Sequence, residues 1–299
     1  MPHQTNYFIK QFAYINDCPE NVQNLTLQGN LQTNCSGIRN LVKWYHEASR
    51  YTNTCISTDC MELDWLDANL SAVWSALMSR LKRTHGLTFH VDAETLAKKF
   101  SILIRNGFHS DNAIAIDRTE SFIQNASFGP LDDVPFNTYV REELLSQKQL
   151  TNLPPVLKGL LESNLEELRT NVIRHAATED PLFVCGQFYP HSRKLKISFV
   201  DTGQTFLPPI HRCTNGAIIT QQDAINWALA GNSEQLDGGG HALKCLLQVF
   251  NQLGHTLQIV SGDTFWDSSA LDTGLGPFRE LFTVMPGTII NFVFEIPEN

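Results

Sequence analysis

The feature that most constrains the fold is a long run of helical periodicity near the middle of the chain, with strand-like segments behind it. Residues 155–177 repeat apolar side chains every three or four positions, which predicts one long helix with a single buried stripe. The stripe consists of Leu157, Leu160, Leu161, Leu165, Leu168, Val172 and Ile173. Segments 182–189 and 195–201 are predicted strands, and residues 288–296 alternate as a strand covered on one face does. This order predicts an α/β structure in which the helix lies on a sheet.

Similar patterns predict further elements along the rest of the chain. The expected helices are 36–48, 69–83, 93–105, 221–230 and 240–253, and the expected strands are 87–91, 257–260 and 278–284. Ser36 is the expected N-cap of the first helix, and Gly86 is expected to stop the second. Residues 127–139 are dense in turn formers and are expected to form a loop or linker. We therefore expect two domains, residues 1–145 and 146–299.

Composition limits the classes of function. A chain of 299 residues with 42% hydrophobic content buries a substantial core. The formal net charge of -9 argues against a protein that mainly grips nucleic acid or an anionic membrane by broad electrostatics. No apolar run approaches the roughly 18 to 20 residues of a membrane span. Residues 1–16 lack the apolar stretch of a secretory signal.

The cysteines point to a reducing compartment. There are seven, dispersed and without CxxC spacing, which fits free thiols in a cytoplasm. A zinc site that includes Cys55 and Cys60 is the less favoured alternative, because no second pair matches them.

Polar side chains recur on one side of the long predicted helix. Glu167, Asn171 and His175 are spaced four residues apart, so they project from nearly the same side. The simpler alternative is an amphipathic helix with a solvated face. Further along, the apolar strand 197–200 ends in Asp201, with Gly203 two residues later. A carboxylate there can accept a hydrogen bond from an exocyclic amine, although an acid followed by glycine is also common in ordinary turns.

A glycine-rich segment precedes the helix predicted from residue 240. Residues Gly238, Gly239 and Gly240, followed by His241, free backbone N–H groups to surround phosphate oxygens at a helix N-terminus. A flexible connector is the alternative. Neither a P-loop nor a complete dinucleotide-binding glycine motif occurs in the chain. Gly287 and Thr288 open the last predicted strand, where the threonine hydroxyl can contact a base or a bridging water.

Taken in order, these segments resemble the motifs of the GHKL (histidine kinase-like) ATPases. Glu167-x3-Asn171-x3-His175 is similar to the N box of that superfamily, in the spacing found in anti-sigma-factor serine kinases. Asp201-x-Gly203 resembles the first glycine box, Gly238-x-Gly240 the second, and Gly287-Thr288 the closing element. The resemblance covers about residues 155–296. It implies a Bergerat fold, which is an α/β sandwich of helices on a mixed sheet that holds ATP with Mg²⁺.

The resemblance also implies a role for each residue. Asn171 supplies an oxygen ligand to Mg²⁺, Asp201 binds adenine, and residues 238–241 hold the phosphates. Glu167 is the general base, while His175, Gly203 and Thr288 complete the nucleotide site. Two positions depart from the family pattern, because Thr205 and Ala242 stand where glycine is usual. These departures put phosphate closure and turnover in doubt more than adenine binding.

The first half resembles STAS-like segments, which are usually protein-interaction modules. The likeness rests on residues 64–69, Asp-Trp-Leu-Asp-Ala-Asn, and on Asn106-Gly107-Phe108, within about residues 30–140. Core helices with a turn are the alternative explanation. The combined expectation is a cytoplasmic bacterial regulatory protein, either an ATPase or a protein serine kinase acting with a partner such as a STAS-type protein. The rival hypothesis is a nucleotide-gated interaction module that binds ATP or ADP without significant turnover.

Overall fold

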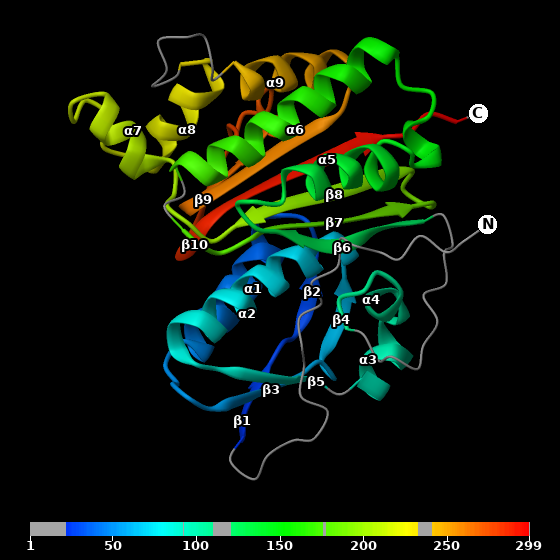
Figure 1. Ribbon diagram of the computed structural model, residues 1–299, viewed down its shortest axis with the longest axis vertical. Coiled ribbons are helices and arrows are strands. Elements are labelled where there is room, and N and C mark those ends of the chain that lie inside the picture. The colour runs from blue at the N-terminus through cyan, green and yellow to red at the C-terminus, as the bar shows by residue number, and fades with distance from the viewer. Residues whose placement is uncertain (1–21, 92, 110–120, 176–177, 233–240, 299) are drawn as a thin grey trace.

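The computed structural model of the chain describes residues 22–91, 93–109, 121–175, 178–232 and 241–298. Within these ranges, nothing is described of the side chains of residues 93, 94, 97, 174 and 175. The structure is layered: a five-stranded sheet has helices on both faces, and a smaller parallel sheet lies beyond the helices of the first half (Figure 1). The expected α/β class is therefore confirmed. None of the helices in these ranges is long and apolar enough to span a membrane.

The five-stranded sheet has the order β6-β7-β8-β10-β9. Its strands are β6 (Phe122–Phe128), β7 (Leu182–Tyr189), β8 (Lys194–Asp201), β9 (Thr256–Asp267) and β10 (Phe278–Glu295). All neighbours pair antiparallel, so the expectation of a mixed sheet is wrong for this sheet. The segments expected as two strands, 278–284 and 288–296, form the single irregular strand β10, whose pairing with β9 shifts register between Glu280 and Thr288.

One face of this sheet is covered by helices that follow residue 132 in the chain (Figure 1). These are α5 (Asp133–Tyr139), α6 (Pro155–His175), α8 (Gln221–Leu229) and α9 (Ala242–Gln252), with α7 (Leu207–Cys213) beside α8. Leu161 and Leu165 of α6 join a buried cluster with Phe292 and Phe294 of β10. The periodicity of residues 155–177 predicts the buried side of α6, although Ile173 near its C-terminal end is exposed. The expectation that the last strand is covered on one face only is wrong, because residues 288–294 are all buried and helices cover both faces of the sheet.

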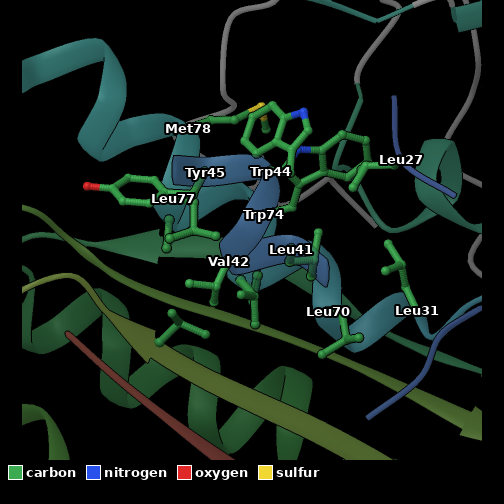
Figure 2. Close-up of a cluster of buried hydrophobic side chains, with 14 of the residues drawn as sticks. Leu27, Leu31, Leu41, Val42, Trp44, Tyr45, Leu70, Trp74, Leu77 and Met78 are labelled. Carbon is green, nitrogen blue, oxygen red and sulfur yellow. The ribbon is translucent and has the colours of Figure 1, made fainter. Parts of the chain in front are cut away.

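The first half covers the opposite face with α1 (Cys35–Ala48) and α2 (Ser71–His85). Beyond them, β1 (Val22–Thr26), β3 (Cys55–Asp59) and β5 (Thr88–Val91) form a parallel sheet, and β2 (Gly29–Leu31) pairs with β4 (Leu63–Leu66). The remaining α-helices of the described residues are α3 (Ala93–Lys99) and α4 (Ser101–Arg105). Short 3-10 helices lie at Ala68–Leu70, Lys148–Leu150 and Ser268–Ala270, and a short π-helix at Val140–Leu144. Figure 2 shows Trp44 and Trp74 packed in the core between these layers, where their rings meet edge to face.

Several local expectations are corrected. Asn34, not Ser36, caps α1, because its side chain accepts a hydrogen bond of 2.9 Å from Gly37 N–H. Gly86 ends α2 in a left-handed conformation, as expected. The segment 127–139 is not a loop throughout, since it contains the end of β6 and all of α5. Phe136 and Tyr139 of α5 are buried, and this packing outweighs the turn-forming residues around them.

The motif residues of the first half face the five-stranded sheet. Asp67 accepts a hydrogen bond from Lys196 Nζ at 2.6 Å, and Asn69 Nδ2 donates to Ser198 Oγ at 2.8 Å, both on β8. Asn106 Nδ2 lies 3.4 Å from Cys185 Sγ on β7. This burial supports the explanation of both motifs as packing elements. Strand β6 precedes the expected boundary at residue 145, yet it pairs with β7 in the five-stranded sheet, whose other strands follow that boundary.

Candidate functional site

A cavity of about 150 Å³ lies between α6, strands β8 and β10, and the helices α7, α8 and α9. Four of the residues singled out in the sequence line it, namely Glu167, Asn171, Asp201 and Thr288. They come from a helix and two strands far apart in the chain. The fold therefore brings these four residues together. From the sequence, their proximity was expected only because of the motif resemblance.

The helix α6 presents a polar row to this cavity. Asn164, Glu167 and Asn171 lie three and four positions apart, which places them on one side of the helix. Asn164 is buried, and its Nδ2 donates to the carbonyl of Leu160 at 2.6 Å. Sequence reasoning missed Asn164, because the four-residue spacing, continued toward the N-terminus, points to Ser163, whereas Asn164 lies three residues before Glu167. His175 ends α6, and its side chain lies outside the described part of the structure.

Asp201 lies at the end of β8 and is almost completely buried. Its Oδ1 accepts a hydrogen bond of 2.9 Å from Gly203 N–H, and no ion pair among the described residues includes it. Burial raises the pKa of the Asp201 carboxyl to about 7, against the lowering effects of the Gly203 N–H and of Arg80. Gly203 itself does not line the cavity and acts here as a donor to Asp201.

A second buried carboxylate nearby behaves in the opposite way. Burial acts to raise the pKa of Asp180, but hydrogen bonds from Arg83 and Thr202 outweigh this effect and hold the pKa below its ordinary value. Asp180 is therefore a paired structural anion. Asp201 combines burial with a position in the cavity and makes no ion pair among the described residues, and such carboxyl groups are candidates for functional sites.

Strand β10 begins its pairing with β8 at Thr288, and there its backbone lies close to Asp201. Thr288 pairs with Asp201 across the sheet, and Gly287 precedes it with φ 127°. A Cβ atom on Gly287 would lie 2.2 Å from the backbone oxygen of Asp201, so a side chain cannot be accommodated there. The hydroxyl of Thr288 lies 3.3 Å from that of Ser261. Thr288 lines the cavity, and the absence of a side chain at Gly287 allows β10 to approach Asp201 this closely.

The glycine segment itself, Gly238, Gly239 and Gly240, lies outside the described residues. His241 directly precedes α9 and is exposed, and it does not line the cavity. On the two sides of this segment, Asn232 and Ala242 both line the cavity. A Cβ on Gly231 would lie 2.9 Å from His241 Nδ1, so the described chain converges there beside the cavity.

The outer wall of the cavity was not anticipated from the sequence. It includes Gln204, Phe206, Pro209, Ile210 and Trp227, from α7, α8 and the loop before them. No local pattern singles out these residues, since each also fits an ordinary amphipathic helix or loop. Thr205 and Ala242, the two departures from the glycine boxes, also line the cavity.

The side-chain donors of the described residues limit which metal ions the site can hold. Among the described residues, no group of three or more His, Cys, Asp or Glu side chains is arranged to hold a metal ion. Mg²⁺ is usually bound through one or two protein oxygens together with waters and substrate phosphates. Asn171 and Glu167, on the same cavity-facing side of α6, fit this sparse donor set.

Comparison with known proteins yields no match to a family model, to a curated protein or to a solved structure. The function is therefore inferred from the geometry of the site and from the motif resemblance.

Proposed function

We propose that this protein is a cytoplasmic regulatory protein that binds ATP with Mg²⁺ in the cavity beside α6. The observation that carries the proposal is the buried Asp201 carboxyl on the floor of an apolar cavity that Glu167, Asn171 and Thr288 also line. Apolar walls with a few convergent polar groups and a perturbed pKa are typical of small-ligand sites.

The size of the cavity suggests which part of the nucleotide it encloses. At about 150 Å³ it is smaller than the roughly 300 to 1,000 Å³ of sites that enclose a whole ligand. We infer that the cavity takes the base, with Asp201 accepting a hydrogen bond from the exocyclic amine of adenine. The phosphates would then extend toward the N-terminus of α9, where backbone N–H groups and the helix dipole favour anions. The resemblance also assigns the phosphates to residues 238–241, of which 238–240 lie outside the described residues.

We assign metal binding and proton transfer to two different residues of α6. The amide oxygen of Asn171 would hold Mg²⁺, and the carboxylate of Glu167, one helical turn earlier, would act as general base. Glu167 would take the proton from a water, giving ADP and phosphate, or from a serine hydroxyl of a partner protein, such as a STAS-type protein, giving ADP and a phosphoserine.

A second candidate is a nucleotide-gated interaction module that binds ATP or ADP without significant turnover. Two observations favour it. Thr205 and Ala242 line the cavity where the resembled family has glycine, and α1 and α2 of the first half pack directly on the sheet that carries Asp201.

Isothermal titration of the purified protein with ATP, with and without Mg²⁺, tests binding. Labelled ATP, incubated with the wild type and with Glu167→Gln, then separates the candidates. Product formed by the wild type and lost in the variant supports catalysis, whereas tight binding without product in either supports gating. Absence of ATP binding by the wild type would refute both.

A further inference from the structure

Helix α2 lies on the face of the sheet opposite α6 and forms hydrogen bonds with residues close to Asp201. Arg80 donates through Nη1 to the carbonyl oxygen of Thr202, the residue next to Asp201. Arg83 donates through Nε and Nη2 to the two oxygens of Asp180, at 2.6 and 2.7 Å. Thr202 Oγ1 donates to the same carboxylate at 2.8 Å. We call these four residues, Arg80, Arg83, Asp180 and Thr202, the arginine clamp.

The arginine clamp differs from a surface ion pair because its carboxylate and its threonine are buried. The Asp180 side chain is 2% exposed, and Thr202 is fully buried, although Arg83 reaches partly into solvent. An exposed ion pair contributes little, but removing one partner of a buried carboxylate leaves an uncompensated charge. The two-point geometry of Arg83 on Asp180 also fixes orientation in a way that a single contact does not. The position of Thr202 therefore depends on α2.

The clamp acts on a backbone with little freedom to adjust. Gly287 of β10 lies so close to Asp201 and Thr202 that a Cβ on it would clash with both. The Gly203 N–H, one residue past Thr202, donates to the Asp201 carboxylate. A shift of Thr202 would therefore change the position of the one backbone donor that orients Asp201 among the described residues.

We propose that α2 sets the nucleotide affinity of the Asp201 site through the arginine clamp, which makes Arg83, Asp180 and Thr202 positioning residues. The inference rests on the proposed function and names its route of regulation. Any event that moves α2, such as binding of a partner to the first half, changes ATP affinity, and ATP reciprocally stabilises the contact of α2 with the sheet.

The affinity test uses Thr202→Val, which keeps the side-chain shape and removes the hydrogen bond to Asp180, together with Arg83→Met. The matched control is Lys194→Met, which removes an exposed pair with Glu295 at the opposite end of the same strand, β8. By calorimetry, we expect each clamp variant to bind ATP about tenfold more weakly, a usual size for coupling between sites. The control is expected to bind as the wild type does. Arg83→Lys keeps the positive charge but loses the two-point contact with Asp180, so its ATP affinity is expected to lie between those of the wild type and Arg83→Met.

A local readout distinguishes positioning from general destabilisation. In the nucleotide-free protein, hydrogen exchange at the Gly203 amide is expected to speed up in Thr202→Val, while amides in the middle of β9 and β10 keep their protection. Unchanged ATP affinity and unchanged Gly203 exchange in both clamp variants would overturn the inference. Equal acceleration at all these amides would also overturn it, because the clamp would then only stabilise the fold. If the wild type binds no ATP, the proposed function fails, and the nucleotide-free exchange still decides whether the clamp orders Asp201.

Discussion

Replacing Asp201 by Asn is the most informative single change, because it is expected to gain stability relative to the wild type as the pH rises, while impairing function. In the folded protein, burial raises the pKa of Asp201 from its ordinary value of 3.8 to about 7. A carboxyl group with a raised folded pKa stabilises the fold fully only below its unfolded pKa. That stability is lost as the pH rises between the two values, and the loss is complete above the folded one. The wild type should therefore become less stable between about pH 4 and pH 7 through this group.

The size of the effect follows from the shift. At about 1.4 kcal/mol for each pKa unit, a rise from 3.8 to about 7 corresponds to about 4 kcal/mol. In Asp201→Asn, the amide oxygen can still accept from Gly203 N–H, while the new NH₂ group is buried at a cost that does not depend on pH. The difference in unfolding free energy between variant and wild type should thus move by about 4 kcal/mol in favour of the variant from pH 4 to pH 8.

Urea denaturation of both proteins, followed by circular dichroism at each pH unit from 4 to 8, measures this difference. Asp64→Asn is the control, because Asp64 is exposed and its replacement should change stability by less than about 0.5 kcal/mol at any pH. A stability difference for Asp201→Asn that stays constant with pH would refute the idea that this carboxyl is buried at a raised pKa.

The same variant tests the assignment of the ligand contact. Losing a charge-assisted hydrogen bond to adenine should weaken ATP binding by roughly tenfold to a hundredfold, or about 1.5 to 3 kcal/mol. ATP should therefore raise the melting temperature of the variant less than that of the wild type at pH 8. Unchanged affinity with intact circular dichroism would show that Asp201 does not bind the base.

Three other changes test the remaining parts of the site. In calorimetric titrations with and without Mg²⁺, Asn171→Ala should abolish the Mg²⁺-dependent tightening of ATP binding, whereas Glu167→Gln should largely keep it. Equal behaviour of the two variants would contradict their separate roles. Gly287→Ala should lower the unfolding free energy in urea by about 2 kcal/mol or more, because of the positive φ at this position and the clash with Asp201. The control Gly274→Ala, which has open space around it, should leave the unfolding free energy nearly unchanged. A non-hydrolysable ATP analogue should slow hydrogen exchange at the N-terminus of α9 and also within residues 60–110, and protection confined to the second half would count against coupling between the halves.

The sequence by itself determined the elements with the clearest apolar patterns. The stripe of residues 155–177 predicted α6 to within two residues, because helical periodicity reports a buried side. The apolar segments 182–189 and 195–201 match β7 and β8 closely, because continuous apolar runs of this length are typical of strands buried on both faces. The motif resemblance also implied that Glu167, Asn171, Asp201 and Thr288 belong to one site, and all four line the same cavity. Whether that cavity binds ATP stays a prediction.

Tertiary structure alone decided the features that depend on which segments meet. Strand β6 joins the sheet of the second half, and α5 forms in a segment rich in turn formers, because long-range pairing and burial outweigh local preference. The opposite pKa shifts of Asp180 and Asp201 likewise depend on Arg83 of α2, which reaches one carboxylate and not the other. Local sequence encodes which face of an element is apolar, whereas the charge state and orientation of a buried group depend on neighbours that only the folded chain brings within hydrogen-bond distance.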